Sequence, residues 1–147
     1  MEFNELISDF ATRHGIEGLS AEDGVTALDI DGIVITLAAD GDALVVAAEI
    51  GEPPAEGRAE FADTLLEANQ GANTILAKNH ETGRYILVRR LAFVSLDSAT
   101  FDASLEEFVN QAEIWRKFLA DFRPFAKAAD EMKGEVPVFG AGGFMQV

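Results

Sequence analysis

The chain has no cysteine among its 147 residues. This absence excludes a disulfide framework, a metal site built on thiolates and a cysteine nucleophile. It also fits a reducing compartment, so we expect the protein in the cytoplasm.

Positive charge is scarce too, because 11 basic residues stand against 26 acidic ones and the formal net charge is −15. A surface of this sign repels phosphate backbones, which argues against nucleic-acid binding. The charge keeps the protein in solution, and it can also steer a basic or polar partner towards it.

Long apolar runs are missing as well. The two longest, Ile33–Ala39 (broken by Thr36) and Ala43–Ala48, are far shorter than the ~20 residues of a membrane-spanning helix. The start of the chain, Met1–Glu5, carries neither a basic region nor a long apolar stretch. We therefore expect no secretory signal and no membrane insertion.

Residues suited to catalysis are few. The two histidines, His14 and His80, each lack a second histidine at metal-ligand spacing. Asp29–Gly32 and Asp40–Asp42 lack the ligand pattern and final glutamate of a calcium loop, and they favour hairpin turns. Gly140–Gly143 is not followed by the helix and Lys-Ser/Thr pair of a phosphate loop. We predict no catalytic residue, no cofactor and no metal, so that the protein is not an enzyme.

Apolar residues make up 48% of the chain, enough for the core of one domain. Helical spacing of apolar residues predicts a helix over Glu2–His14. Three strand patterns follow at Val25–Ile30, Val34–Ala39 and Leu44–Ile50. Asp31-Gly32 separates the first two, and Asp-Gly between apolar runs predicts a hairpin, so this region is an antiparallel meander.

The second half repeats this alternation. A helix is predicted over Gly57–Gln70, followed by strands at Thr74–Lys78 and Tyr85–Phe93. A long apolar stripe then predicts a last helix from about Leu105 to Phe122.

Cap residues are expected at the start of this last helix. We expect Asp102 to cap it, with Ser104 and Glu107 as a capping box one turn later. Pro124 ends the domain, taken as residues 1–123, and residues 124–147 form a tail that contains Gly and Pro. The predicted fold class is α+β: a helix, a three-strand meander, a helix, two to three strands and a long C-terminal helix.

These patterns together resemble a class I type III secretion chaperone of the CesT/SycE-like kind, the Tir chaperone family. The resemblance extends from Phe3 to Phe122. It rests on the Leu65–Asn69 segment Leu-Leu-Glu-Ala-Asn, on Gly83–Leu87 as the entry to the next strand, and on Leu105–Trp115 in the last helix.

The resemblance implies a homodimer that binds the extended N-terminal segment of a secreted effector protein, without ATP. Such a bound segment is called the client here. The implied dimer contacts are Phe61, Leu65, Leu66, Asn69 and Ile75. The implied client-binding residues are Leu6, Phe10, Ile33 and Ile35.

Two alternatives stay open. The same fold occurs in protein-binding or regulatory modules with no secretion role, as in the YbjN-like group. An enzyme with an unrecognised carboxylate site would need a deep pocket with convergent acidic groups. The tail is longer than the family pattern requires, and it either dangles or lies in a groove in place of a client.

Overall fold

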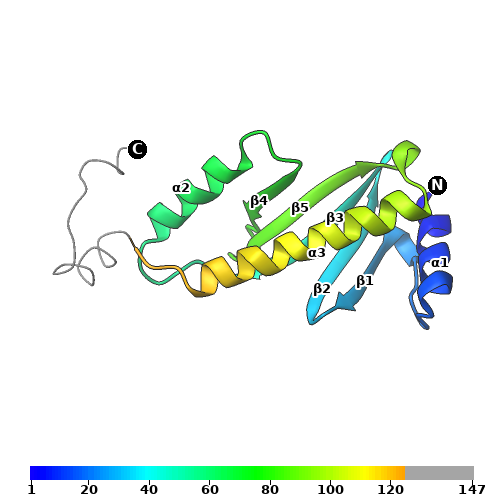
Figure 1. Cartoon of the computed structure of the whole chain (residues 1–147), viewed down its shortest axis with the longest axis horizontal. Coiled ribbons are helices and arrows are strands. Elements are labelled where there is room, and N and C mark those ends of the chain that lie inside the picture. The colour runs from blue at the N-terminus through cyan, green and yellow to red at the C-terminus, as the bar shows by residue number, and fades with distance from the viewer. Residues whose placement is uncertain (125–147) are drawn as a thin grey trace.

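The computed structural model describes residues 1–124 and gives them an α+β fold, which confirms the predicted class. The elements in chain order (Figure 1) are α1 (Phe3–His14), β1 (Val25–Ile30), β2 (Ile33–Asp40), β3 (Ala43–Gly51), α2 (Arg58–Asn69), β4 (Thr74–Lys78), β5 (Tyr85–Ala92) and α3 (Ser98–Ala120). Short 3-10 helices precede β1 (η1, Glu22–Gly24) and follow β5 (η2, Phe93–Ser95). The predicted tail, residues 124–147, lies outside the described residues except for Pro124.

The five strands form one antiparallel sheet in the order β1-β2-β3-β5-β4. The predicted turn between β1 and β2 is present, and its residues Asp31 and Gly32 have φ values of 54° and 84°. Two positive φ angles in succession are what a type I′ hairpin requires. β5 pairs with both β3 and β4, so the second half of the chain completes the sheet and leaves β1 and β4 as its edges.

One face of this sheet carries the core. The strand register aligns Leu28, Ile35, Ala48, Leu87 and Leu76 in one row across all five strands, and each of them is buried. Helical residues complete the core: Phe3, Leu6, Ile7 and Phe10 of α1, Phe61 and Leu65 of α2, and Phe101, Leu105, Phe108, Val109 and Ala112 of α3. Each large apolar side chain buried in this way contributes roughly 1.5–3 kcal/mol of transfer free energy.

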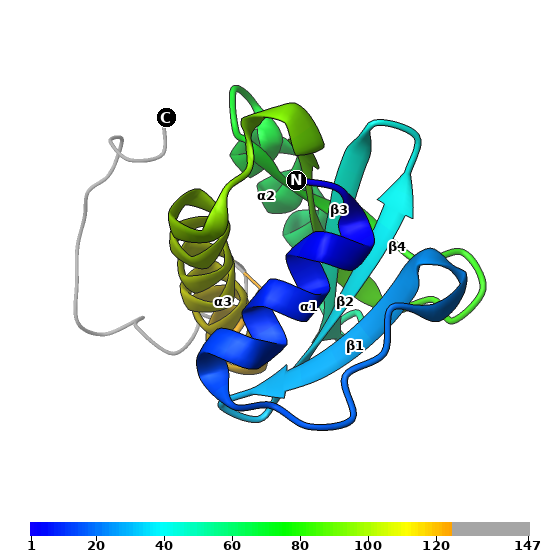
Figure 2. The same ribbon diagram turned by 90° about the vertical axis from the view of Figure 1, so that its right-hand side faces the viewer.

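The opposite face of the sheet is open. α1 and α3 lie on the core side, and in Figure 2 no helix of residues 1–124 covers the other side. Because side chains alternate along a strand, Val25, Val34 and Ile75 project from this open face and are exposed.

α3 begins earlier than the sequence predicted. Its N-cap is Asp97, whose Oδ1 accepts the Thr100 backbone N–H at 2.8 Å, while Thr100 Oγ1 accepts the Asp97 N–H at 2.8 Å. This reciprocal pair satisfies two donors that the first helical turn leaves free. The earlier start also brings Phe101 into the core, where it is fully buried.

The residues expected to cap α3 lie inside the helix, so that prediction is wrong. Asp102 binds the Arg13 guanidinium of α1, and Glu107 Oε1 accepts a hydrogen bond from Arg89 of β5 at 2.6 Å. Both lie inside the helix, as does Ser104. Carboxylates of α3 therefore bind other elements of the fold.

Candidate functional site

A groove of about 570 Å³ lies between α1, β1 and the first half of α3. Figure 2 shows α1 with α3 and β1 on either side of it. The floor of the groove is apolar: Phe10, Ile16, Leu28, Ile30, Leu105 and Val109. Ile16 and Ile30 are half-buried and the other four are buried. A partner that fills the groove would therefore cover apolar surface.

Carboxylates surround this floor. Asp29, Asp31 and Glu106 line the groove, and none of the three forms an ion pair within residues 1–124. Asp102 also lines it, but its charge is balanced by Arg13. The rim thus has a net negative charge beside an apolar floor.

A hydrogen-bonded network joins α1 to α3 along this rim. Arg13 Nη2 donates to Asp102 Oδ1 at 3.0 Å, and Arg13 Nε donates to Asp9 Oδ2 at 2.7 Å. Ser98 Oγ donates to the same Asp9 oxygen at 2.7 Å. The hydrogen bond from Ser98, and then that from Arg13, lowers the pKa of Asp9, whereas Arg13 and then His14 lower the pKa of Asp102. Both carboxylates are therefore ionised at neutral pH.

The outer edge of β1 borders the groove and is unpaired. Within residues 1–124 no backbone hydrogen bond from another segment reaches it. Alternate residues of an edge strand direct their N–H and C=O groups away from the sheet. A partner strand could pair there and place every second side chain in the groove.

The opposite edge, at β4, is covered by a side chain. Leu76 N–H donates to Asn69 Oδ1 at 2.8 Å, and Asn69 Nδ2 donates to the Leu76 carbonyl at 2.9 Å. The carboxamide of Asn69 thus bonds both main-chain groups of Leu76, as a neighbouring strand would do. At this position β4 cannot accept a further strand unless Asn69 moves.

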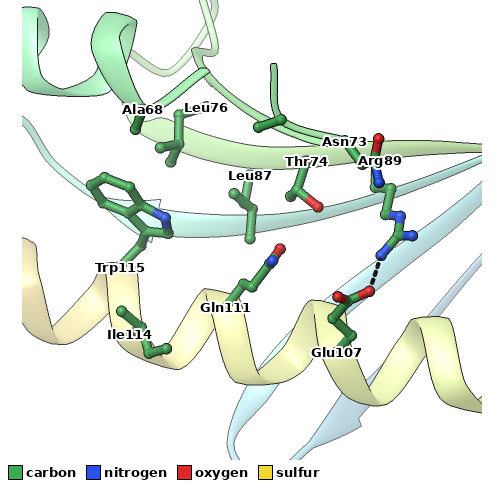
Figure 3. A pocket seen from close by; sticks show the side chains of 11 residues that line it. Ala68, Asn73, Thr74, Leu76, Leu87, Arg89, Glu107, Gln111, Ile114 and Trp115 are labelled. Carbon is green, nitrogen blue, oxygen red and sulfur yellow. Dashed lines mark hydrogen bonds and ion pairs between the residues drawn. The ribbon is translucent and has the colours of Figure 1, made fainter. Parts of the chain in front are cut away.

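A second, smaller pocket of about 290 Å³ lies between α3 and the strands β4 and β5. In Figure 3 Trp115 lies towards Leu76 at one end, and the ion pair between Arg89 and Glu107 lies at the other end. Gln111 lies between them, and its Oε1 has no hydrogen-bond partner within residues 1–124. Polar groups occupy much of this pocket, so the groove beside β1 is the better site for apolar side chains.

Neither a cluster of metal ligands nor a membrane-spanning helix is found within residues 1–124. Within residues 1–124 no group of three or more His, Asp or Glu side chains is placed to hold a metal ion. None of the helices formed by these residues is long and apolar enough to cross a membrane.

Comparison with protein families gives a match over most of the chain. The model described as the Tir chaperone protein (CesT) family matches residues 5–116. The chain belongs to this family. The match begins within α1 and ends within α3, so it includes all five strands, and the predicted family is confirmed. A comparison with curated proteins found no match.

Three solved structures share this family member's fold. A chain of the ExsC–ExsE complex has 22% identity and a TM-score of 0.69, covering 79% of this chain and 92% of that one. A chain of the Yersinia pestis structure of the type III secretion chaperone SycH with a fragment of YscM2 has 21% identity and a TM-score of 0.63, with coverages of 78% and 99%. A chain of the HopA1–SchA chaperone–effector complex has 18% identity and a TM-score of 0.66, with coverages of 77% and 91%.

The residues that the family resemblance assigned to client binding lie in two different settings. Phe10 lines the groove beside β1. Leu6, Ile33 and Ile35 are buried in the core next to it. The structure therefore brings the four together in one region, with Phe10 alone among them at the groove.

Sequence reasoning missed most of the groove. Leu105 and Val109 were expected only as part of the apolar stripe of the last helix, and Ile16 was not considered. Ile30 was assigned to a strand but not to a site. Four-residue spacing places Leu105 and Val109 on one face of a helix, but it cannot tell which strand or helix that face meets.

The predicted dimer contacts also divide into buried and exposed residues. Phe61 and Leu65 are buried, and Asn69 makes the hydrogen bonds to β4 described above. Leu66 is 69% exposed and Ile75 is 39% exposed. These two are the members of the set that a second copy could contact directly.

Proposed function

We propose that this protein is an ATP-independent chaperone of the cytoplasm that binds the extended N-terminal segment of a secreted effector protein. One observation carries the proposal: a groove with an apolar floor lies beside an unpaired sheet edge, in a chain of the Tir chaperone family. A complex described as chaperone–effector among the structures with this fold supports it.

The physical basis is strand addition at β1, which gains main-chain hydrogen bonds, together with burial of client side chains against Phe10, Ile16 and Ile30. Ordering a disordered segment costs conformational entropy, so binding needs a large contact surface. Groove and edge together offer more surface than either does separately. No step of this binding uses ATP.

We also propose that the protein works as a homodimer through α2 and β4. Leu66 and Ile75 are the exposed apolar residues of α2 and β4, whereas Phe61 and Leu65 are buried and Asn69 bonds to Leu76. Isolated exposed apolar residues are also common on monomers, so the oligomeric state in solution is the test. Sedimentation at micromolar concentration should show a dimer, which Leu66→Asp should dissociate and Val94→Asp should leave intact. Val94 is 92% exposed and lies outside α2 and β4. A wild-type monomer would refute the dimer.

The client proposal is tested by capture followed by reconstitution. Tagged full-length protein is used to capture partners from a lysate of its own organism, and the N-terminal segment of each captured protein is then purified. We expect direct binding of such a segment with the same Kd in the presence and absence of ATP.

Two variants make this experiment specific. Ile30→Asp places a charge on the groove floor and should weaken binding by roughly tenfold or more, as loss of a central apolar contact does. Val94→Asp should bind as the wild type does. Capture of only folded, non-secreted partners would favour a regulatory module of the same fold instead.

A further inference from the structure

The groove beside β1 joins two kinds of surface. Its floor consists of six apolar side chains, and its lining also includes Asp29, Asp31 and Glu106. The Asp29 side chain shares the open face of the sheet with its cross-strand partner Val34. Asp31 comes from the turn after β1, whereas Glu106 comes from α3. The charges of Asp31 and Glu106 therefore lie on different walls of the groove, so a segment in the groove would have a carboxylate on either side.

The basic side chains beside the groove have other partners: His14, which lines it, lies with its Nε2 3.1 Å from Asp102 Oδ2. Arg13 is the arginine next to the groove, and it binds Asp102 and Asp9. Within residues 1–124 none of the ion pairs involves Asp29, Asp31 or Glu106. Like charges close to one another repel, and a cation from a partner would relieve this repulsion.

We infer that the groove between α1, β1 and α3 selects polypeptide segments in which Lys or Arg residues flank the apolar residues that enter the groove. This inference rests on the proposed chaperone function and adds a charge rule to it. The apolar residues bury against Phe10, Ile16 and Ile30, and the flanking cations lie beside Asp31 and Glu106. The formal charge of −15 acts in the same direction at longer range, because it raises the encounter rate with basic segments.

The test uses three synthetic peptides with the same apolar residues, flanked by Lys, by Gln or by Glu. Fluorescence anisotropy with the full-length protein measures the Kd of each at low and at high salt. The Lys peptide should bind roughly tenfold or more tightly than the Glu peptide at low salt, since several weak ion pairs are exchanged for repulsions. High salt should narrow this difference, because exposed charges are screened.

Charge variants locate the effect. Glu106→Lys should weaken binding of the Lys peptide and strengthen binding of the Glu peptide, each by a few-fold in Kd. Glu113→Lys is the matched control, because Glu113 is an exposed residue of the same helix that does not line the groove. Equal shifts in both variants would mean that net charge alone acts, which would overturn the inference for this groove.

The outcomes separate the inference from the proposed function. Equal binding of the three peptides would overturn the charge rule and leave the chaperone proposal standing. Binding of none of them, together with no client in the capture experiment, would overturn both. A competition experiment uses a peptide of residues 125–147. If this peptide displaces the labelled Lys peptide at a lower concentration than unlabelled Lys peptide does, the occupant of the groove is the chain's own C-terminal segment. If Glu106→Lys dissociates a dimer, the occupant of the groove is a second copy of the chain.

Discussion

The two edges of the sheet are finished in different ways. At β4 the Asn69 carboxamide donates to and accepts from the main chain of Leu76. At β1 no segment of residues 1–124 pairs with the outer edge, and an apolar groove lies beside it. Unpaired edges invite other strands, and proteins usually cover them. Strand addition is therefore hindered at the β4 edge of this sheet and possible at the β1 edge.

α2 is the element that makes the edges differ. It packs beside β4 and is held there by Phe61, whose ring stacks on Tyr85 at 5.3 Å and on Phe118 at 5.6 Å between centroids. β1 has α1 and α3 near its core face, but no element formed by residues 1–124 pairs with its outer edge. Variants that loosen α2 should therefore make the β4 edge behave more like the β1 edge.

The largest effect is expected from Phe61→Ala. The side chain is fully buried, and its loss should lower the free energy of unfolding by roughly 3–5 kcal/mol, from lost burial and the cavity left behind. Urea denaturation measures this change, and Glu67→Ala, an exposed position of the same helix, should stay within about 0.5 kcal/mol. A loss below about 1 kcal/mol would show that Phe61 does not hold α2 in place.

Gly57→Ala should have the next largest effect. Gly57 precedes α2 with a φ of 74°, and an added Cβ would lie 2.8 Å from Pro124 Cγ. Backbone strain and overpacking together should cost roughly 2–4 kcal/mol. Gly83→Ala is the matched control, because Gly83 has a φ of 75° but nothing within 4 Å of the added Cβ. Equal losses in the two variants would mean that the close approach to Pro124 contributes nothing.

Asn69→Ala tests the covered edge directly. It leaves the Leu76 N–H and C=O without their partner, which should cost roughly 1–3 kcal/mol. Amide hydrogen exchange at Leu76 should become faster. The control Gln70→Ala should change neither the free energy of unfolding nor the exchange rate at Leu76. Unchanged protection of the Leu76 amide would show that Asn69 does not close this edge.

Asp102→Asn should give the smallest effect, on the β1 side. The lowered pKa of Asp102, caused first by Arg13 and then by His14, means that its ion pair stabilises the fold above the ordinary carboxyl pKa of about 3.9. This contribution is lost as the pH falls through the lower pKa of the folded state. The free energy of unfolding of the wild type should therefore fall more steeply with acidification than that of Asp102→Asn. Parallel pH profiles of the wild type and Asp102→Asn would argue against a stabilising ion pair. The control Glu113→Gln should have the same pH profile as the wild type.

Most of the elements could be predicted from the sequence. The strands Val25–Ile30 and Thr74–Lys78 have the predicted bounds, and the other strands and the first two helices differ by a residue or two at their ends. The start of α3 was wrong because two acidic residues compete for the N-cap. Asp97 takes it, while Asp102 bonds to Arg13, 89 residues away in sequence.

The candidate site was much less predictable. Phe10 was the one groove residue assigned to client binding in advance, and that assignment came from the family resemblance. Leu105 and Val109 join it only because α3 crosses beside β1. Asn69 was assigned to a dimer contact, and the structure shows that its carboxamide bonds to Leu76 of β4 within the same chain.

The sequence by itself determined the order and type of the elements, since apolar periodicity and Asp-Gly turns act between residues that are close along the chain. It also determined the acidic surface and the absence of thiol chemistry. Only the tertiary structure decided which sheet edge is covered, where the groove lies and which carboxylates of its rim keep an unbalanced charge. Each of these depends on how α2 and α3 pack against distant strands, and local sequence patterns do not encode such contacts.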